Sequence, residues 1–117
     1  MKSVNRTPTL LLSEAAPMLA FKATAALYEE QPELWKLGER GRARTLEDFG
    51  HHFGALAPLD AGVFREHVLF CEQLFDNHGF PRAWLTDAWR IMAQTIREEM
   101  SESAAIPALD VLRSVTP

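Results

Sequence analysis

Apolar residues recur at three- and four-residue intervals along most of the chain, which is the spacing of one face of an α-helix. No segment alternates apolar and polar residues for long enough to predict a β-strand. The pattern predicts one all-α domain over residues 13–117, with four main helices and two short ones, behind a flexible arm of residues 1–12. The helical segments are expected at residues 13–30, 34–37, 45–57, 61–78, 81–101 and 107–114.

Capping residues stand at several of these predicted ends. Thr45 and Asp48 have the spacing of a capping box, and Asp60 is the expected N-cap of the next helix. Gly79 suits the left-handed position just past a helix end, and Pro81 suits the opening of the helix that follows. Because the connections near these residues are short, neighbouring helices are expected to pack antiparallel or to cross sharply.

Each long helix is expected to bury one apolar face. The expected inward residues of the first helix are Met18, Phe21, Ala25 and Tyr28. Those of the long helix after Pro81 are Leu85, Ala88, Met92, Ile96 and Met100. Gly50 and Gly54 weaken the helix that contains them, so a neighbour approaching closely is the expected reason for both.

Composition and charge narrow the class of protein. The chain has 117 residues, of which 47% are hydrophobic and 24% charged, as in ordinary globular domains. Its net charge of −4 gives no electrostatic reason to expect nucleic-acid binding, and a basic cluster at Arg40, Arg42 and Arg44 is expected in a solvated loop. The single cysteine excludes an internal disulfide, and no apolar run reaches bilayer length, so a cytoplasmic protein without a membrane segment is expected.

Two histidines lie within the predicted buried faces. His52 shares one face with Phe49, Phe53 and Leu56, and Asp48 precedes it by one helical turn. A carboxylate at that position is expected to orient the imidazole and favour its protonated form. A buried histidine is also an ordinary core residue when its ring nitrogens are hydrogen-bonded, and both interpretations remain open for His52.

The following helix repeats this arrangement with His67. Its predicted apolar stripe is Phe64, His67, Val68, Cys71 and Leu74. His67 and Cys71 have the i, i+4 spacing that lets two metal ligands share a helix face, with His52 as a third, but none of the common metal-binding motifs is present. A thiol inside an apolar stripe is poorly exposed, so a non-enzymatic protein is expected.

The order of residues in this central segment resembles a known family. The matching positions are Asp48, His52, Phe53, Leu56, Ala57, Val63, Phe64, His67, Val68, Phe70, Leu74, Gly79, Phe80 and Pro81. They are similar to a bacterial globin-like helical family related to phycobiliproteins, over roughly residues 20–100. His67 stands where a tyrosine is commoner in that family, and Phe70 where a tryptophan is commoner.

The resemblance implies a globin-like accessory or sensory module that binds or hands over a bilin-type tetrapyrrole, or assists a partner that does. The partner implied is a bilin-synthesis enzyme or a cobalamin-binding sensor. A flat ligand of this kind would contact His52, His67 and Asp48, with apolar walls and a cation for its propionates. The expected walls are Phe49, Phe53, Phe64, Val68 and one of Trp84 or Trp89, and the candidate cations are Arg65, Arg82 and Arg90.

Two alternatives use the same residues differently. The first is a helical interaction domain, often a homodimer, in which the polar core residues only specify packing. The second is a small metal-binding protein that uses His52, His67 and Cys71.

Overall fold

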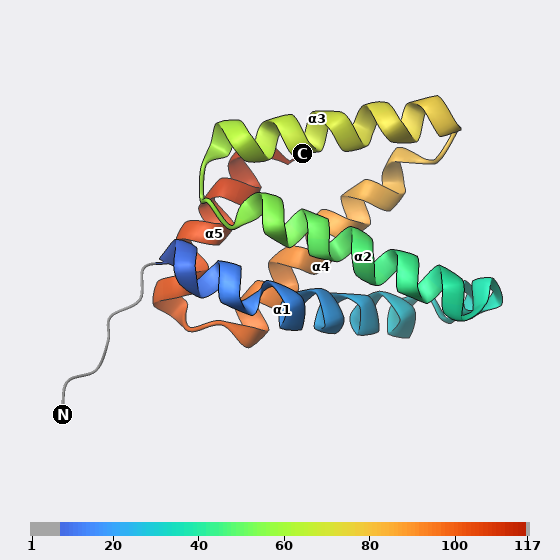
Figure 1. Ribbon diagram of the computed structural model, residues 1–117, viewed down its shortest axis with the longest axis horizontal. Helices are drawn as coiled ribbons and strands as arrows, with labels where there is room; N and C mark the ends of the chain where they lie inside the picture. The colour runs from blue at the N-terminus through green and yellow to red at the C-terminus, as the bar shows by residue number, and fades with distance from the viewer. Residues whose placement is uncertain (1–7, 117) are drawn as a thin grey trace.

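The structure, a computed structural model, describes residues 8–116, and all of its regular elements are helices (Figure 1). Five α-helices and one 3-10 helix, η1, follow one another along the chain. They are α1 (Pro8–Glu30), η1 (Pro32–Leu37), α2 (Gly38–Leu56), α3 (Ala61–His78), α4 (Arg82–Glu99) and α5 (Glu102–Val115). The all-α prediction is therefore confirmed for this range. None of the helices between residues 8 and 116 is long and apolar enough to cross a membrane.

Helices α1 and α2 form one antiparallel pair, and α2 and α3 form a second (Figure 1). Helices α4 and α5 each pack against both α1 and α3. Helix α2 runs back along α1 after the turn made by η1, and α3 reverses again after the loop that follows α2. Helix α4 crosses behind α2 to reach α1, while α5 packs at the end of the molecule that holds the α2–α3 loop. Trp89 of α4 contacts the facing sides of both α2 and α3, at His52 and at Phe64.

Helix α1 differs from the prediction in both its start and its buried face. It begins at Pro8 and continues through Pro17, so residues 8–12 are helical, while residues 1–7 of the predicted arm lie outside the described range. Of the four expected inward residues only Tyr28 is buried. The buried face consists of Leu12, Leu19, Ala20, Ala23, Thr24 and Tyr28. Alanine and leucine residues of this helix occur on most of its sides, so its sequence hardly distinguishes one face from another.

Helix α2 begins seven residues before the predicted start at Thr45. Thr45 lies inside the helix, where its hydroxyl donates to the Gly41 carbonyl at 3.1 Å, so the predicted capping box is wrong. The arginine cluster belongs to the first turns of this helix rather than to a loop. Arg42 has a structural reason to be there, since its guanidinium lies 5.6 Å from the ring centre of Phe21 and 6.0 Å from that of Trp35.

The ends of α3 and the start of α4 agree with the prediction. Asp60 Oδ1 accepts from the backbone N–H groups of Gly62 at 2.8 Å and Val63 at 3.1 Å. Gly79 ends α3 in the left-handed conformation, with φ of 69°, and Pro81 immediately precedes α4. The last helix starts at Glu102, five residues before the predicted Pro107, which the helix accommodates in its interior.

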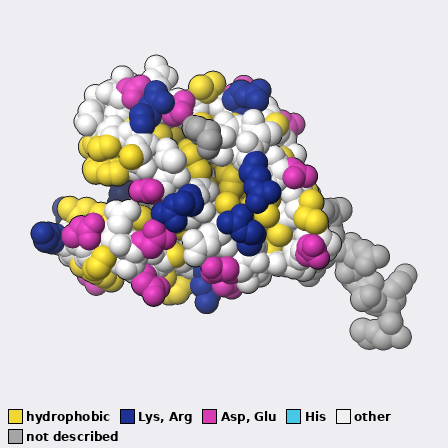
Figure 2. Space-filling model, turned by 180° about the vertical axis from the view of Figure 1, so that it is seen from behind, with side chains coloured by type: hydrophobic (Ala, Val, Ile, Leu, Met, Phe, Trp, Pro, Cys, Tyr) yellow, Lys and Arg dark blue, Asp and Glu magenta, His cyan; other side chains and the backbone are white. Residues whose placement is uncertain are grey.

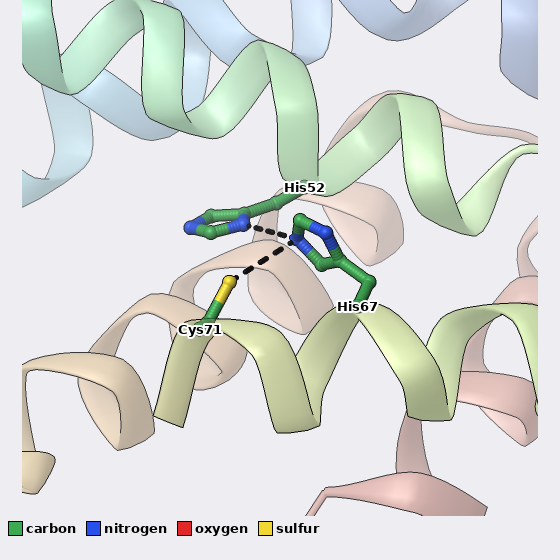
Figure 3. Close-up of side chains that lie close together, drawn as sticks. All are labelled: His52, His67 and Cys71. Carbon is green, nitrogen blue, oxygen red and sulfur yellow. Dashed lines mark hydrogen bonds between the residues drawn. The ribbon is translucent and has the colours of Figure 1, made fainter. Parts of the chain in front are cut away.

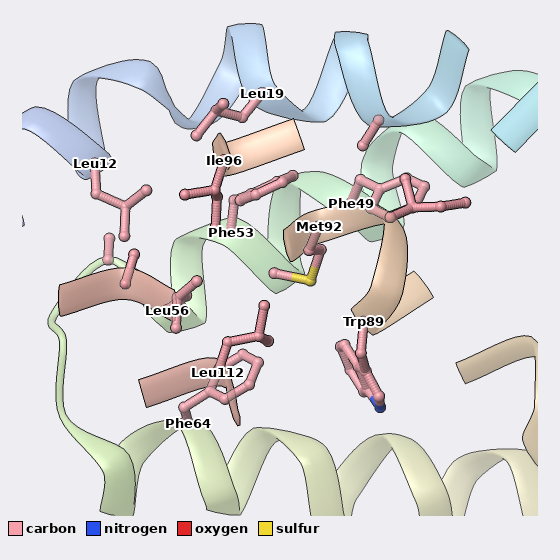
Figure 4. Packing of buried hydrophobic residues seen from close by; sticks show 14 of the residues in the cluster. Leu12, Leu19, Phe49, Phe53, Leu56, Phe64, Trp89, Met92, Ile96 and Leu112 are labelled. Carbon is pink, nitrogen blue, oxygen red and sulfur yellow. The ribbon is translucent and has the colours of Figure 1, made fainter. Parts of the chain in front are cut away.

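One hydrophobic core joins all five α-helices (Figure 4). Phe53 and Leu56 of α2, Phe64 of α3 and Met92 of α4 all belong to it, with Phe53 on the side of α1 and Phe64 on α3. The stripe predicted for α2 is confirmed, because Phe49, His52, Phe53 and Leu56 are all buried. Trp89 of α4 is also buried in this core, with its ring centre 5.8 Å from that of Phe64 (Figure 4).

Candidate functional site

The two inward-facing histidines meet directly in the space between α2 and α3 (Figure 3). His52 Nδ1 lies 2.8 Å from His67 Nε2, and Cys71 Sγ lies 3.5 Å from the same His67 nitrogen. The pattern of the sequence explains this arrangement, since each histidine belongs to the apolar face of its own helix and the two helices run antiparallel. At the short contact between the rings, one nitrogen donates a proton and the other accepts it.

Aromatic rings surround the histidine pair. The Trp89 ring centre lies 4.8 Å from that of His52 and 6.4 Å from that of His67. Phe49 packs edge-on against His52 at 6.0 Å, and Phe64 lies 5.9 Å from His67. These contacts hold both imidazoles in place and keep water away from one side of them, which preorganises their nitrogens.

Burial keeps the two histidines neutral. It lowers the pKa of His52 to about 3, with further lowering from the nearby charges of His67 and His51. The pKa of His67 is also lowered, first by burial and then by His51. Neutral imidazole is the form that coordinates metals, so both rings are ready to act as ligands at neutral pH.

Cys71 is buried, and its thiol is protonated at neutral pH. Burial raises the pKa of this thiol to about 11, and the negative charges of Asp48 and Glu72 act in the same direction. Because the thiolate is the nucleophilic form, the thiol has little reactivity of its own. A bound cation would instead favour the thiolate of Cys71, since coordination displaces the thiol proton.

The predicted pairing of Asp48 with His52 is wrong. The hydrogen-bonding partner of His52 is His67, and the carboxylate of Asp48 instead lies 3.6 Å from Arg44, one turn earlier on α2. Its side chain is 54% exposed. Partial burial raises the pKa of the Asp48 carboxyl, and the positive charge of Arg44 offsets only part of this rise. The carboxylate therefore neither orients His52 nor favours its protonated form.

The other predicted ligand residues divide between the site and the rest of the molecule. Phe64 and Trp89 border the histidine pair, and Phe53 is buried in the core behind them. Trp84 is 54% exposed and packs instead against Phe80 at the α3–α4 corner. Arg90 makes a two-fold hydrogen bond with Glu30 of α1, at 2.8 and 3.2 Å, and so is engaged away from the histidines.

Two further predicted positions also differ. Leu74, expected at the end of the inward stripe of α3, is exposed. Arg82, an alternative cation for propionates, pairs with Asp76 and Glu72. Cys71, in contrast, was absent from the residues expected to contact a tetrapyrrole, although its i, i+4 spacing from His67 was the signal that could have placed it there.

The three side chains present the donor atoms of a metal site. One ring nitrogen each of His52 and His67 and the sulfur of Cys71 all lie within 4.8 Å of one another. Ligand atoms around a tetrahedral zinc ion are separated by about 3.3–3.7 Å, given metal–nitrogen and metal–sulfur bonds of about 2.0–2.3 Å. For all three atoms to bind one ion, the 2.8 Å contact between the imidazoles must lengthen, and any separation near the 4.8 Å limit must shorten.

Comparisons of the chain with known protein families, with characterised protein sequences and with solved structures gave no significant match. The resemblance to phycobiliprotein-related proteins, and with it the globin-like arrangement, stays a prediction. Function must therefore be argued from the site itself.

Proposed function

We propose that this protein is a small helical metal-binding protein that holds a transition-metal cation between α2 and α3. The observation that carries the proposal is the convergence of His52, His67 and Cys71, which lie within 4.8 Å of one another on facing helices. Buried polar groups are usually satisfied by hydrogen bonds, and within residues 8–116 the side-chain hydrogen bonds of His52, His67 and Cys71 run to one another. A cation could bind all three atoms once the proton between the rings moves to the far nitrogen of its own imidazole and the thiol proton is lost to solvent.

The donor atoms select the class of metal. Two neutral imidazoles and one thiolate form a borderline-to-soft set, which suits Zn²⁺, Cu⁺ and related ions rather than Mg²⁺ or Ca²⁺. The surrounding rings of Phe49, Phe64 and Trp89 enclose the pair on its apolar side. The proposed role is non-enzymatic holding of the ion.

Metal titration of the purified, reduced protein tests the proposal. We expect one equivalent of Co²⁺, used as a coloured substitute for Zn²⁺, to bind with a thiolate-to-metal absorption band. His52→Ala, His67→Ala and Cys71→Ser should each weaken binding by about 100-fold or more, beyond the effect of losing an outer partner. His51→Ala is the matched control, because His51 is the exposed neighbour of His52 and pairs with Glu47 at 3.8 Å. Binding that survives in all three variants, or that is absent from the wild type, would overturn the proposal.

The tetrapyrrole function stays a prediction of the sequence resemblance. Bilin binding would require the rings around His52 and His67 to separate, since Trp89, Phe49 and Phe64 occupy the space next to them. Absorption spectra of biliverdin and of haem, recorded with and without the protein, test it directly. Spectra identical to those of the free pigments would contradict the prediction of tetrapyrrole binding.

A further inference from the structure

The α2–α3 pair contains a fourth potential ligand, opposite Cys71. Asp48 precedes His52 by one turn on α2, and Cys71 follows His67 by one turn on α3. The two helices run antiparallel from the loop that joins them (Figure 3). Because His52 faces His67, moving one turn away from the loop on both helices brings Asp48 opposite Cys71. Each helix thus places an i, i+4 pair at facing positions, and of these four residues only His52, His67 and Cys71 already have their ligand atoms within 4.8 Å of one another.

Asp48 lies at the exposed edge of this arrangement, since its side chain is 54% exposed. Its carboxylate would have to turn toward the histidines to reach a bound cation.

The present partner of Asp48 holds it weakly. Its ion pair with Arg44 is long, at 3.6 Å, and the arginine side chain is 75% exposed. Exposed i, i+4 pairs of this type contribute little to stability. A cation arriving at the histidines would therefore compete with Arg44 for the carboxylate at little cost.

Other charged neighbours are less available. Glu72 follows Cys71, but its carboxylate is bound by Arg82 of α4 at 3.2 Å and its side chain is only 23% exposed. Glu47 lies beside Asp48 in sequence, yet it pairs with His51 on the exposed side of α2. Asp48 is thus the acidic residue that combines the right register with a loosely held carboxylate.

We propose that Asp48 is the fourth ligand of the metal site, released from Arg44 when the cation binds. This inference rests on the proposed function, because it completes the coordination of the His52, His67 and Cys71 cluster. The thiol loses its proton to solvent, and one thiolate and one carboxylate then neutralise a divalent ion. The resulting two-nitrogen, one-sulfur, one-oxygen set favours Zn²⁺ over the monovalent Cu⁺.

Cobalt spectroscopy of charge-matched variants tests this ligand. Asp48→Asn removes the charged oxygen with little change of size, and Glu47→Gln removes the same charge from the neighbouring position. We expect Asp48→Asn to weaken Co²⁺ binding by about tenfold or more and to alter the visible d–d bands, with Glu47→Gln unchanged on both counts. Arg44→Ala should tighten binding by about twofold, in line with the loss of a weak competing pair.

The possible results separate the two proposals. If Asp48→Asn matches the wild type in affinity and spectrum while Cys71→Ser loses binding, the three-residue site stands and the fourth ligand is wrong. Equal weakening by Asp48→Asn and Glu47→Gln would assign the effect to general charge and would also exclude direct ligation. If the wild type binds no Co²⁺, the proposed function itself fails. Circular dichroism confirms that each variant is folded.

Discussion

At the scale of single residues, His52 links the stability of the fold to pH. Its pKa is about 3 in the folded protein, against 6.5 for the unperturbed group. The unfolded chain therefore binds a proton between these two values while the folded protein does not. The contribution of His52 is complete above pH 6.5 and is lost progressively as the pH falls toward 3.

We therefore predict that His52 makes the free energy of unfolding decrease as the pH falls from 6.5 to 4, by up to about 1.4 kcal/mol per pH unit, the slope that one differential proton gives. Urea unfolding of the metal-free protein at a series of pH values measures this slope. His52→Phe should flatten it, whereas His51→Ala should retain most of it because His51 is the smallest of the three causes of the shift. An unchanged slope in His52→Phe would contradict the assignment.

Tyr28 provides a second prediction at this scale. Its hydroxyl is buried and has no hydrogen-bond partner among the described residues, while its ring packs edge-on against Trp35 at 4.9 Å. Tyr28→Phe keeps the ring and removes the unsatisfied group, so it should stabilise the protein by about 1 kcal/mol. Thermal unfolding would show this, and a clear loss of stability would indicate that the hydroxyl has a partner such as water.

At the scale of elements, the glycines of α2 correct one expectation. No neighbouring element approaches Gly50 or Gly54, since a Cβ at either position would have nothing within 4 Å. These residues therefore lower the stability of the helix without a packing reason. At Gly41, in contrast, an added Cβ would lie 2.5 Å from the Cβ of Leu37, which is too close.

This contrast predicts opposite effects of one substitution on the same helix. Gly54→Ala should raise the free energy of unfolding by about 0.5–1 kcal/mol, the intrinsic difference between the two residues in a helix. Gly41→Ala should lower it, because Leu37 must move. Denaturant unfolding of both variants measures the difference, and equal changes in the two would contradict it.

The elements also show which predictions local sequence can support. The ends at Asp60 and Gly79 were predictable because each depends on a cap within a few residues of the chain. The starts of α2 and α5 were not, since both helices extend through segments that lack a strong apolar period. For α1 the face was misassigned, because apolar residues surround it and its neighbours decide which side is covered.

At the scale of the whole molecule, a bound metal should stabilise the fold by joining α2 to α3. A ligand at 100 times its dissociation constant adds about 2.7 kcal/mol to the free energy of unfolding. We predict a higher melting temperature with Zn²⁺ and its reversal by a chelator. Cys71→Ser should show neither effect. A melting temperature that is indifferent to Zn²⁺ in the wild type would contradict the proposal.

The surface of the molecule bears on the homodimer and partner predictions, which remain untested. Lysine, arginine, aspartate and glutamate side chains are interspersed on the face shown in Figure 2, with apolar residues between them. Large apolar side chains are exposed at the α3–α4 corner, where Phe80 and Trp84 pack together at 5.5 Å. If the homodimer forms through this corner, light scattering should give twice the monomer mass, and Trp84→Ser should return the monomer. A monomer in the wild type would contradict the prediction.

By itself, the sequence determined the all-helical character and the presence of His52 and His67 on buried faces, because both follow from periodicity within single helices. The tertiary structure decided how these polar groups are paired. Asp48 was the expected partner of His52 as its neighbour along the helix, yet the contact between α2 and α3 brings His67 to 2.8 Å and leaves Asp48 with Arg44. Which side chains meet across two helices depends on their register, and that register is set by the packing of the whole core.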